Sequence, residues 1–424
     1  MKILVIGSGG REHAIVRKLK ESPLVEALYC APGNGGISRD AECFPVNAMD
    51  KEGMLALAKE KAVDLVFVAP DDPLAAGMVD DLEAAGFPCF GPNAAAAQIE
   101  ASKVFSKNLM KKYHIPTAGY EVFSDPAAAL DYIRAQGTYP AVIKADGLAL
   151  GKGVIIAQNE EEARAALHSI MEDKVFGESG SQVVVEEFLT GPEVSVLAFT
   201  DGKTLKPMVS SMDHKRAFDG DKGPNTGGMG TISPNPFYTE EVANACMEQI
   251  FLPTMAAMNA EGRPFKGCLY FGLMLTPQGP KVIEYNSRFG DPETQVVLPR
   301  LKTDFARIVK AVAEEKLAEV DIQWDEGASA CVVMASGGYP GSYPKGLEIT
   351  GLDENGQAAG ATVYHAGTKY EDGRFLTNGG RVLGVTALGA TLEEALDKAY
   401  AAVGTISFEG AMYRKDIGRT HPKG

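Results

Sequence analysis

The sequence predicts a multidomain protein of mixed α/β and α+β class that begins with a doubly wound parallel sheet and ends with a β-rich domain. The chain has 424 residues, which is too long for one ordinary hydrophobic core. Its first residues are typical of a strand, a glycine loop and a helix, the opening unit of a doubly wound sheet. From residue 328 onward, short strand-like segments and turns dominate.

Composition restricts the function classes. The net charge of −15 argues against a surface that binds nucleic acid or an anionic membrane. No apolar run is long enough to span a bilayer. The six cysteines contain no CxxC pair and no metal-binding spacing, which is typical of reduced thiols. We therefore expect a cytoplasmic protein that uses neither nucleic acid nor a membrane. The sequence favours a monomer and leaves oligomeric assembly open.

The amino-terminal glycine loop is the first candidate site. It follows the predicted strand Lys2–Ile6 and precedes a helix that runs through Lys20. Backbone N–H groups at a helix N-terminus can hold an anion, so Gly9 and Gly10 are candidate contacts for a phosphate-bearing ligand. The dinucleotide fingerprint is incomplete, because Glu12 stands where its third glycine would be.

Further strands of the same sheet are predicted at residues 28–31, 63–69 and 87–91. The loop that starts at Pro70 carries Asp71, at the carboxyl edge where such sheets bind ligands. A single long helix capped by Asn93 is expected next, ending before Ile115. It carries Lys103, which without further context is an ordinary solvated helix lysine.

A glycine-rich connection joins two predicted strands at residues 141–145 and 154–157. Lys144 ends the first strand, and the connection closes with Gly151, Lys152 and Gly153. Glycines allow close backbone approach to phosphates and the lysines neutralise charge, which favours a flap over a phosphate chain. The alternative is an ordinary hairpin with a flexible tip.

Two polar loops follow. In the first, EEFLTGPE at 186–193, the pattern suits a hinge that lines an adenine pocket, although it could equally be a charged loop. Its candidate residues are Glu186, Glu187, Leu189 and Glu193. The second loop, residues 213–230, is too polar and glycine-rich for a core element, which favours a functional loop. Its candidate residues are Asp213, Lys215, Asn225, Thr226 and Gly227.

The segment KVIEYNSRFGDPE at 281–293 combines a strand pattern with clustered polar groups. Alternate residues of a strand share a face, so Glu284, Asn286 and Arg288 are predicted to project together. Carboxylate and amide oxygens are ligands that Mg²⁺ prefers, and Arg288 offers donors to a phosphoryl or carboxylate group. A solvated strand edge is the alternative. Asp291 follows in the same cluster.

Helices are also expected over residues 240–261, 304–320 and 391–405, the last capped by Thr391. In the closing β-rich domain His365 is predicted to be structural. Arg381 lies in a glycine-rich turn and is either a phosphate contact or a solvated turn residue.

These motifs, in this order, resemble the ATP-grasp superfamily and, within it, the phosphoribosylamine–glycine ligase family. The match covers nearly the whole chain. It is carried by IGSGGREHA at 6–14, KADGLALGKGV at 144–154, EEFLTGPE at 186–193, DHKRAFDGDKGPNTGGMG at 213–230, YFGLML at 270–275, EYNSRFGDPETQ at 284–295 and TNGGRVLGVTALG at 377–389.

The resemblance implies four parts: a pre-ATP-grasp domain, a two-lobed ATP-grasp core and a C-terminal β-rich domain. The expected boundaries are 1–92 for the first, 93–119 with 188–325 for the central domain, 120–187 for its lid, and 326–424 for the last.

The resemblance also implies a reaction in which glycine, 5-phosphoribosylamine and ATP give glycinamide ribonucleotide, ADP and phosphate, through a glycyl phosphate intermediate. By match, Glu284 and Asn286 hold Mg²⁺ or Mn²⁺, while Lys103, Lys144 and the flap hold phosphates. Glu186, Glu187, Leu189 and Glu193 hold adenosine. Arg288 stabilises the transferring group and Asp291 anchors glycine. Gly9, Gly10, Asp71, Arg381 and the 213–227 residues contact the other substrates.

Two departures from the family pattern stand out. Many ATP-grasp enzymes carry an acidic metal ligand on the strand before Glu284, where this chain has Gly272. Relatives have glutamate after Pro70, where this chain has the shorter Asp71. Three rival readings remain: an ATP-grasp enzyme that carboxylates or formylates a ribonucleotide, a dinucleotide-dependent oxidoreductase, and a catalytically silent nucleotide-binding module.

Overall fold

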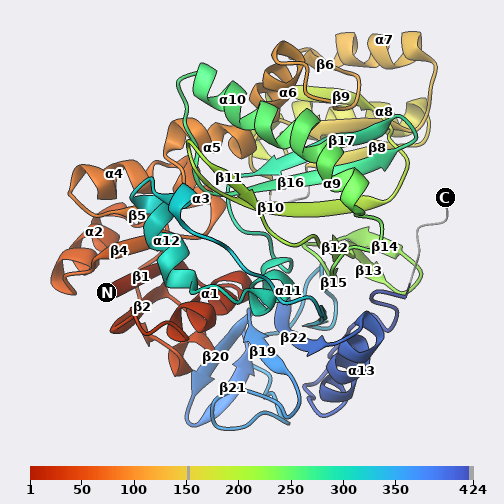
Figure 1. Ribbon diagram of the computed structural model, residues 1–424. Coiled ribbons are helices and arrows are strands. Elements are labelled where there is room, and N and C mark those ends of the chain that lie inside the picture. The colour runs from red at the N-terminus through yellow and green to blue at the C-terminus, as the bar shows by residue number, and fades with distance from the viewer. Residues whose placement is uncertain (150–152, 420–424) are drawn as a thin grey trace.

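The amino-terminal part of the protein forms the predicted doubly wound parallel sheet (Figure 1). The computed structural model describes residues 1–149 and 153–419. The strands lie in the order β3 (Glu42–Cys43), β2 (Ala27–Pro32), β1 (Lys2–Gly7), β4 (Leu65–Val68) and β5 (Cys89–Phe90). Their helices are α1 (Gly10–Lys20), the 3₁₀ turn η1 (Ile37–Arg39), α2 (Lys51–Glu60), α3 (Asp71–Ala75) and α4 (Met78–Ala84). The strands are apolar along their length because helices cover the sheet.

Two antiparallel sheets make up the middle of the chain. The central sheet has the order β11 (Leu205–Pro207), β10 (Glu193–Asp201), β16 (Lys266–Thr276) and β17 (Gly279–Asn286). Helices α9 (Glu240–Cys246), η4 (Met247–Phe251) and α10 (Leu252–Ala260) follow one another beside it. β16 pairs in antiparallel fashion with β17, the strand that carries Glu284.

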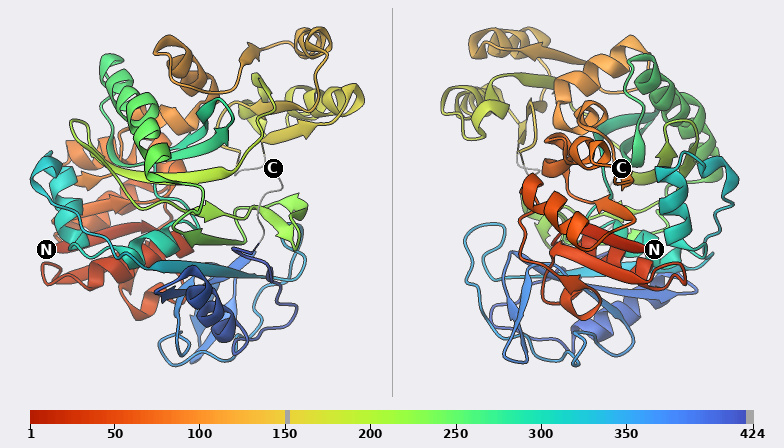
Figure 2. Two further views of the ribbon diagram at one scale, coloured as in Figure 1. Left: turned by 45° about the vertical axis from the view of Figure 1, so that its right-hand side comes forward. Right: turned by 90° about the vertical axis from the view of Figure 1, so that its left-hand side faces the viewer.

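The second antiparallel sheet is smaller. Its strands are β6 (Tyr120–Phe123), β9 (Val183–Glu187), β7 (Ala141–Ala145) and β8 (Val154–Ala157) in that order. With it lie α7 (Pro126–Gln136), α8 (Glu160–Leu167), η2 (His168–Glu172) and η3 (Gly177–Gly180). In both views of Figure 2 this sheet lies at the end of the molecule opposite the C-terminal helix α13 (Leu392–Val403).

The C-terminal sheet includes two strands from the middle of the sequence. Its order is β12 (Met212–Asp213), β15 (Gly230–Ser233), β18 (Ala328–Ala335), β22 (Arg381–Gly389) and β19 (Thr362–His365). Two hairpins lie outside it, β13 (Arg216–Phe218) with β14 (Lys222–Asn225), and β20 (Thr368–Glu371) with β21 (Arg374–Thr377). Strand pairing over such a sequence separation leaves no local pattern, so the sequence did not predict it.

The helix predicted after Asn93 is two helices, α5 (Ala94–Ala101) and α6 (Lys103–Lys112). Asn93 caps the first as expected, through Ala96 N at 2.9 Å. The break falls at Ser102, whose backbone is extended so that its hydroxyl caps α6 and also donates to Asp146. The chain turn that this creates brings Lys103 toward the glycine-rich loop.

The helix predicted over 304–320 is also shorter than expected. It is α12 (Phe305–Ala313), followed by the short turn η6 (Leu317–Glu319). Asp304 caps its first turn, and the left-handed backbone of Glu315 (φ 58°) prevents continuation beyond its end.

One hydrophobic core joins the amino-terminal sheet, α12 and the central sheet. Phe289 lies in it, with ring centroids 6.0 to 6.1 Å from those of Phe67, Phe90, Phe199 and Phe305. Because Phe289 is buried, the polar residues on either side of it are held at a fixed place at the end of β17.

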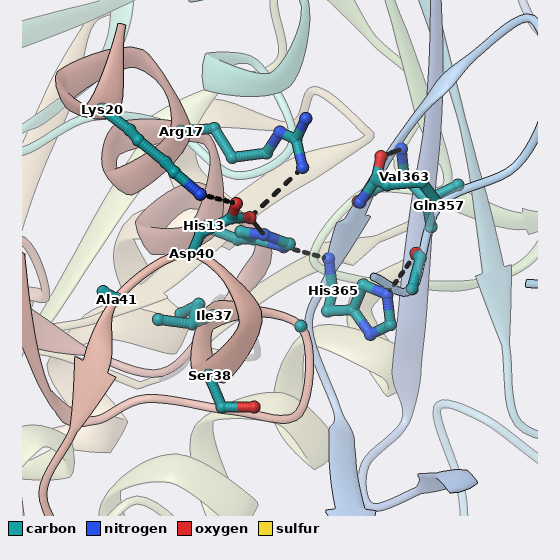
Figure 3. A network of polar contacts seen from close by, with 12 residues as sticks. His13, Arg17, Lys20, Ile37, Ser38, Asp40, Ala41, Gln357, Val363 and His365 are labelled. Carbon is teal, nitrogen blue, oxygen red and sulfur yellow. Dashed lines mark hydrogen bonds and ion pairs between the residues drawn. The ribbon is translucent and has the colours of Figure 1, made fainter. Parts of the chain in front are cut away.

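A buried polar network joins the amino-terminal and C-terminal sheets (Figure 3). His13 Nδ1 accepts from the His365 backbone N–H at 2.8 Å, so its Nε2 carries the proton and donates to Asp40 at 2.9 Å. His365 itself contacts Thr368 and the Gly356 carbonyl through its two ring nitrogens. These contacts place His365 in the core, as predicted.

Among the described residues, no helix is long and apolar enough to cross a membrane. Three elements that position the site complete the fold: α11 (Thr294–Val297), the turn η5 (Leu298–Arg300) and the C-terminal segment 414–418.

Candidate active site

Glu284 and Asn286 end β17 on one face, as the strand pattern predicts. Glu284 lies opposite Gly272 in the β16–β17 ladder. Its carboxylate is 3.4 Å from Lys215 Nζ. Lys215, and more weakly Lys144 and Lys103, lower the pKa of Glu284 to about 2, so the group is ionised at any physiological pH.

Three lysines gather beside this strand. Lys144 donates to the carbonyl of Ile283 at 3.2 Å and pairs with Glu186 at 3.0 Å. Lys103 donates to the Gly147 carbonyl at 2.8 Å, and burial lowers its pKa. Lys107, which the sequence gave no reason to single out, is buried and lies 3.5 Å from Glu186. We call Lys103, Lys107 and Lys144 the lysine cluster. Its positive charges suit the binding of a chain of phosphates.

The hinge predicted at 186–193 follows β9. Glu186 is buried between the lysines, whereas Glu187 is exposed and lies 3.4 Å from Lys281. Leu189 is half-buried and Glu193 is exposed at the start of β10. Of the predicted flap residues, Gly151 and Lys152 lie outside the described residues. Gly153 accepts from Ala145 N at 2.8 Å, which continues the β7–β8 hairpin.

Arg288 is held by an acid that the sequence pattern did not identify. Its NH2 group is 2.9 Å from Oε1 of Glu100, which lies on α5. Asp71 is farther, at 4.0 Å, and so is the weaker partner. Although burial opposes it, these acids raise the pKa of Arg288 above its ordinary value. Asp71 therefore lies near Arg288, but the close ion pair of Arg288 is with Glu100.

Asp291 joins three parts of the chain. Gln295 donates to its Oδ1 at 2.8 Å, and the backbone N–H of Arg11 donates to Oδ2 at 3.4 Å. Arg381 lies 3.6 Å from Oδ1 and donates to the Asp291 carbonyl at 2.9 Å. Burial opposes ionisation of Asp291, but Arg381 and Arg11 lower its pKa on balance.

Arg381 also donates to the carbonyl of Gly227 at 2.9 Å. It is thus a partly buried arginine with several partners, not a solvated turn residue. Thr226 turns back on the loop, because its N–H and its hydroxyl both donate to the Lys215 carbonyl at 2.8 Å. Asn225 ends β14 and is exposed. Arg381 thus bridges the carbonyls of Gly227 and Asp291.

The C-terminal segment holds this loop from the other side. Arg414 is fully buried and makes paired contacts with Asp416 at 2.8 and 2.9 Å. Its third nitrogen reaches Asp221 at 2.9 Å and the Arg216 carbonyl at 3.2 Å. The hairpin β13–β14 is therefore anchored to residues almost 200 positions away, which no local pattern could reveal.

Two neighbouring carboxyl groups face the same region, half-buried Asp213 and buried Glu293. Burial raises the pKa of Asp213, and the neighbouring Glu293 raises it further. Burial likewise raises the pKa of Glu293, whose Oε1 accepts from Tyr270 at 3.2 Å. Gly228 has φ 123° and packs against Asp213, so a side chain there would displace that carboxyl group. The sequence singled out Asp213 but missed Glu293.

The glycine loop differs from a simple anion cradle. Gly9 N–H donates to the carboxylate of Glu12 at 2.8 Å, which in turn pairs with Arg11 at 2.9 Å. A protein carboxylate thus already occupies part of the loop. A Cβ on Gly10 would lie 2.7 Å from Nε2 of Gln295, so the loop packs directly on α11.

A divalent cation fits the end of β17. The ionised Glu284 and the amide oxygen of Asn286 are hard ligands, and Mg²⁺ commonly takes one or two protein oxygens plus substrate phosphates. Within residues 1–149 and 153–419 there is no group of three or more His, Cys, Asp or Glu side chains that could hold a metal by itself. A cation here would therefore be shared with phosphates.

Family models match three consecutive parts of the chain. They are the N domain of phosphoribosylglycinamide synthetase over residues 1–100, its ATP-grasp (A) domain over 101–294 and its C domain over 329–420. ATP-grasp enzymes use ATP with Mg²⁺ or Mn²⁺.

Full-length relatives agree with these matches. The chain is 49% identical over 417 residues to a phosphoribosylamine–glycine ligase of Caldanaerobacter subterraneus, covering 98% of this chain and 99% of the relative. It is 50% identical over 420 residues to the trifunctional purine biosynthetic protein adenosine-3 of Gallus gallus, covering 98% of this chain and 42% of that longer protein.

Solved structures agree as well. The crystal structure of phosphoribosylamine–glycine ligase from Thermotoga maritima superposes with a TM-score of 0.84 at 35% identity, covering 98% of this chain and all of that one. A biotin carboxylase domain of 2-oxoglutarate carboxylase from Hydrogenobacter thermophilus, with ADP and magnesium, shares the fold at TM-score 0.74 and 18% identity, over 97% of this chain and 91% of that one.

Proposed function

Since the chain belongs to the phosphoribosylglycinamide synthetase family, we propose that it ligates glycine to 5-phosphoribosylamine, using ATP, in purine biosynthesis. The products are glycinamide ribonucleotide, ADP and phosphate. The observation that carries the proposal is the convergence of Glu284, Asn286, Arg288 and three lysines at the end of β17, in a chain that matches the family over its full length.

The chemistry requires two displacements. An oxygen of the glycine carboxylate attacks the γ-phosphorus of ATP, and ADP leaves, which gives glycyl phosphate. The amine nitrogen of phosphoribosylamine then attacks the acyl carbon, phosphate leaves, and the nitrogen loses a proton. Such transfers depend on positioning and charge neutralisation more than on a covalent nucleophile.

The phosphates of the nucleotide would lie along the lysine cluster. Lys103, Lys144 and the segment Gly151–Lys152–Gly153 would bind phosphates. Glu186, Glu187, the backbone at Leu189 and Glu193 would hold adenosine. A Mg²⁺ or Mn²⁺ ion held by Glu284 and Asn286 would neutralise the charge of the phosphates when bound.

The other substrates belong between β17 and the C-terminal sheet. Arg288 would stabilise the transferring phosphoryl group and Asp291 would bind the glycine ammonium. The remaining candidate contacts are Gly9, Gly10, Asp71, Asp213, Lys215, Asn225, Thr226, Gly227 and Arg381. Support comes from the contacts that join Asp291, Arg381 and Gly227.

The domain division 1–92, 93–119 with 188–325, 120–187 and 326–424 remains part of the proposal, as do a monomeric state and a cytoplasmic location. In the described part of the chain the cysteines are all free thiols, in keeping with a reducing compartment.

ADP release with glycine and phosphoribosylamine, added separately and together, tests the proposed function. Steady ADP release is expected only when both are present. Steady release with bicarbonate or formate in place of glycine would favour the rival ATP-grasp enzymes. No nucleotide turnover under any of these conditions would indicate a silent binding module.

A further inference from the structure

Glu100 is a buried carboxylate whose contacts extend beyond its ion pair with Arg288. It lies near the end of α5 with a relative exposure of 9%. Its Oε2 accepts from both the backbone N–H and the hydroxyl of Ser287, each at 2.8 Å. Its Oε1 forms an ion pair with Arg288 at 2.9 Å. One side chain from α5 thus contacts the residues that follow Asn286.

The same oxygen also determines how the amide of Asn286 is turned. Hydrogen bonding assigns the amide: with its NH₂ group toward Glu100, that group donates to Glu100 Oε1 at 2.9 Å and to the Tyr285 carbonyl at 3.2 Å. Both partners accept, so in this orientation the amide oxygen faces the opposite side, where its neighbours are donors. Arg288 lies 3.4 Å from the amide atom that faces Glu100 and would favour an oxygen there, but this contact is longer than either hydrogen bond.

We propose that Glu100 is a positioning residue of the metal site, which turns the amide of Asn286 so that its oxygen faces the cation shared with Glu284. This rests on the proposed function, because it takes Asn286 as a metal ligand. An asparagine is a ligand only through its oxygen, and a partner for its nitrogen fixes that orientation. Groups that orient metal ligands in this way commonly change metal affinity when they are replaced.

Replacing Glu100 by glutamine should reverse the amide. In Glu100→Gln the oxygen of the new side chain must face the fixed N–H of Ser287, so its NH₂ group faces Asn286 and Arg288. The amide of Asn286 then has to present its oxygen to that NH₂ group and its nitrogen to the cation. We expect the affinity for the cation to fall by about 10- to 100-fold, the usual range for such partners.

A second substitution provides the rescue. In Glu100→Gln with Asn286→Asp, the carboxylate introduced at position 286 has an oxygen on both branches, so one accepts from the new amide and the other reaches the cation. In Asn286→Asp alone, the new carboxylate faces that of Glu100. Their repulsion should weaken binding of the cation. The double variant should therefore bind the cation more tightly than either single variant, which a purely structural role for Glu100 would not produce.

The test measures Mn²⁺ binding by electron paramagnetic resonance on the full chain, with a non-hydrolysable ATP analogue at fixed saturating concentration. Asp201→Asn is the matched control, since Asp201 is another buried carboxylate, bonded to the N–H groups of Leu317 and Thr204 at 2.9 and 2.8 Å. It should lower stability and leave Mn²⁺ binding unchanged.

Weakened binding in Glu100→Gln with recovery in the double variant supports the proposal. Wild-type binding in Glu100→Gln, while Asn286→Ala loses it, overturns the positioning role alone. Wild-type binding in both Glu284→Gln and Asn286→Ala overturns the metal assignment beneath it. If Glu100→Gln does not fold, the double variant decides: tighter Mn²⁺ binding than in Asn286→Asp supports the role, and equal or weaker binding contradicts it.

Discussion

Gly272 lies directly opposite Glu284 in the β16–β17 ladder, and a Cβ at position 272 would lie 2.9 Å from Cγ of Glu284. The absence of a side chain at 272 is therefore what leaves room for the Glu284 carboxylate to reach Lys215. In the proposed metal site a cation would therefore take no ligand from position 272, and phosphates or water would complete its coordination.

Gly272→Ala should displace Glu284 and raise the Mg²⁺ concentration needed for half-maximal turnover. The added methyl group has to push a Cγ atom, which cannot swing away as a side-chain terminus would. Overpacking of this kind also destabilises by about 1–3 kcal/mol. Turnover measured against Mg²⁺, together with the thermal midpoint, checks both effects. An unchanged Mg²⁺ requirement would show that Glu284 does not need its present position.

Glu284→Gln should impair metal-dependent turnover far more than it lowers stability. The substitution keeps the shape but removes the charge that Lys215 and a cation share. We expect a fall in turnover of about 10- to 100-fold at ordinary Mg²⁺, partly recovered at high Mg²⁺. Steady-state rates across a Mg²⁺ series measure this, with circular dichroism as the control for folding. Turnover at the wild-type level would sink the assignment.

Arg381→Ala should raise the KM for phosphoribosylamine and leave those for ATP and glycine nearly unchanged. Arg381 lies between Gly227 and Asp291, so its loss removes a positive charge where an anionic substrate group is expected. Arg381→Lys keeps the charge but loses the planar guanidinium. Its KM for phosphoribosylamine should lie between those of the wild type and Arg381→Ala. Equal increases in all three KM values would instead indicate that Arg381 acts only by holding the loop.

Arg414→Ala should destabilise the protein by about 1.5–3 kcal/mol, the range for hydrogen bonds to charged groups, because it removes both contacts with Asp416. The hairpin carrying Lys215 and Asn225 loses its anchor as well, so substrate affinity should fall. Urea unfolding gives the stability change. Arg419→Ala, which removes an exposed pair with Asp397, is the matched control and should cost less than about 1 kcal/mol. Similar values for the two variants would contradict this assignment.

The contribution of the buried histidines to stability should fall as the pH is lowered from about 7 to 5. Burial lowers the pKa of His13 and of His214 below the ordinary 6.5, and that of His365 to about 3. Below pH 6.5 the unfolded chain therefore binds more protons at these three residues than the native protein does, and each residue contributes up to about 1.4 kcal/mol per pH unit. Asp213 and Glu293 act in the opposite sense, because their raised pKa values let the native protein bind protons that the unfolded chain does not. The Asp40 carboxylate has a lowered pKa, so its contribution persists through this window.

Urea midpoints at pH 7.5 and 5.0 measure this dependence. His168→Gln is the control, because His168 is exposed and should not affect the slope. His365→Gln removes one buried imidazole and should make the midpoint less sensitive to pH. An unchanged sensitivity in this variant would contradict the assignment.

Local sequence patterns were sufficient to predict many secondary-structure elements, their caps and part of the candidate site. The strand–glycine–helix opening, the caps at Asn93 and Thr391 and the face shared by Glu284 and Asn286 all follow from interactions within a few residues. Such interactions act in any fold that contains the segment, which is why they can be read without one. The resemblance to a family added the order of the motifs and the expected chemistry.

Only the tertiary structure decided which side chains meet. Glu100 reaches Ser287 across 187 positions, and strands β12 and β15 pair with the C-terminal sheet. The predicted long helix is interrupted at Ser102, whose hydroxyl donates to Asp146, a residue distant in the sequence. In each case the favourable contact forms between groups far apart in the chain, so its free energy leaves no periodicity or spacing in the sequence. The Asn286 amide is a further example, since the sequence supplies this candidate ligand whereas α5 supplies the acceptor that faces its amide.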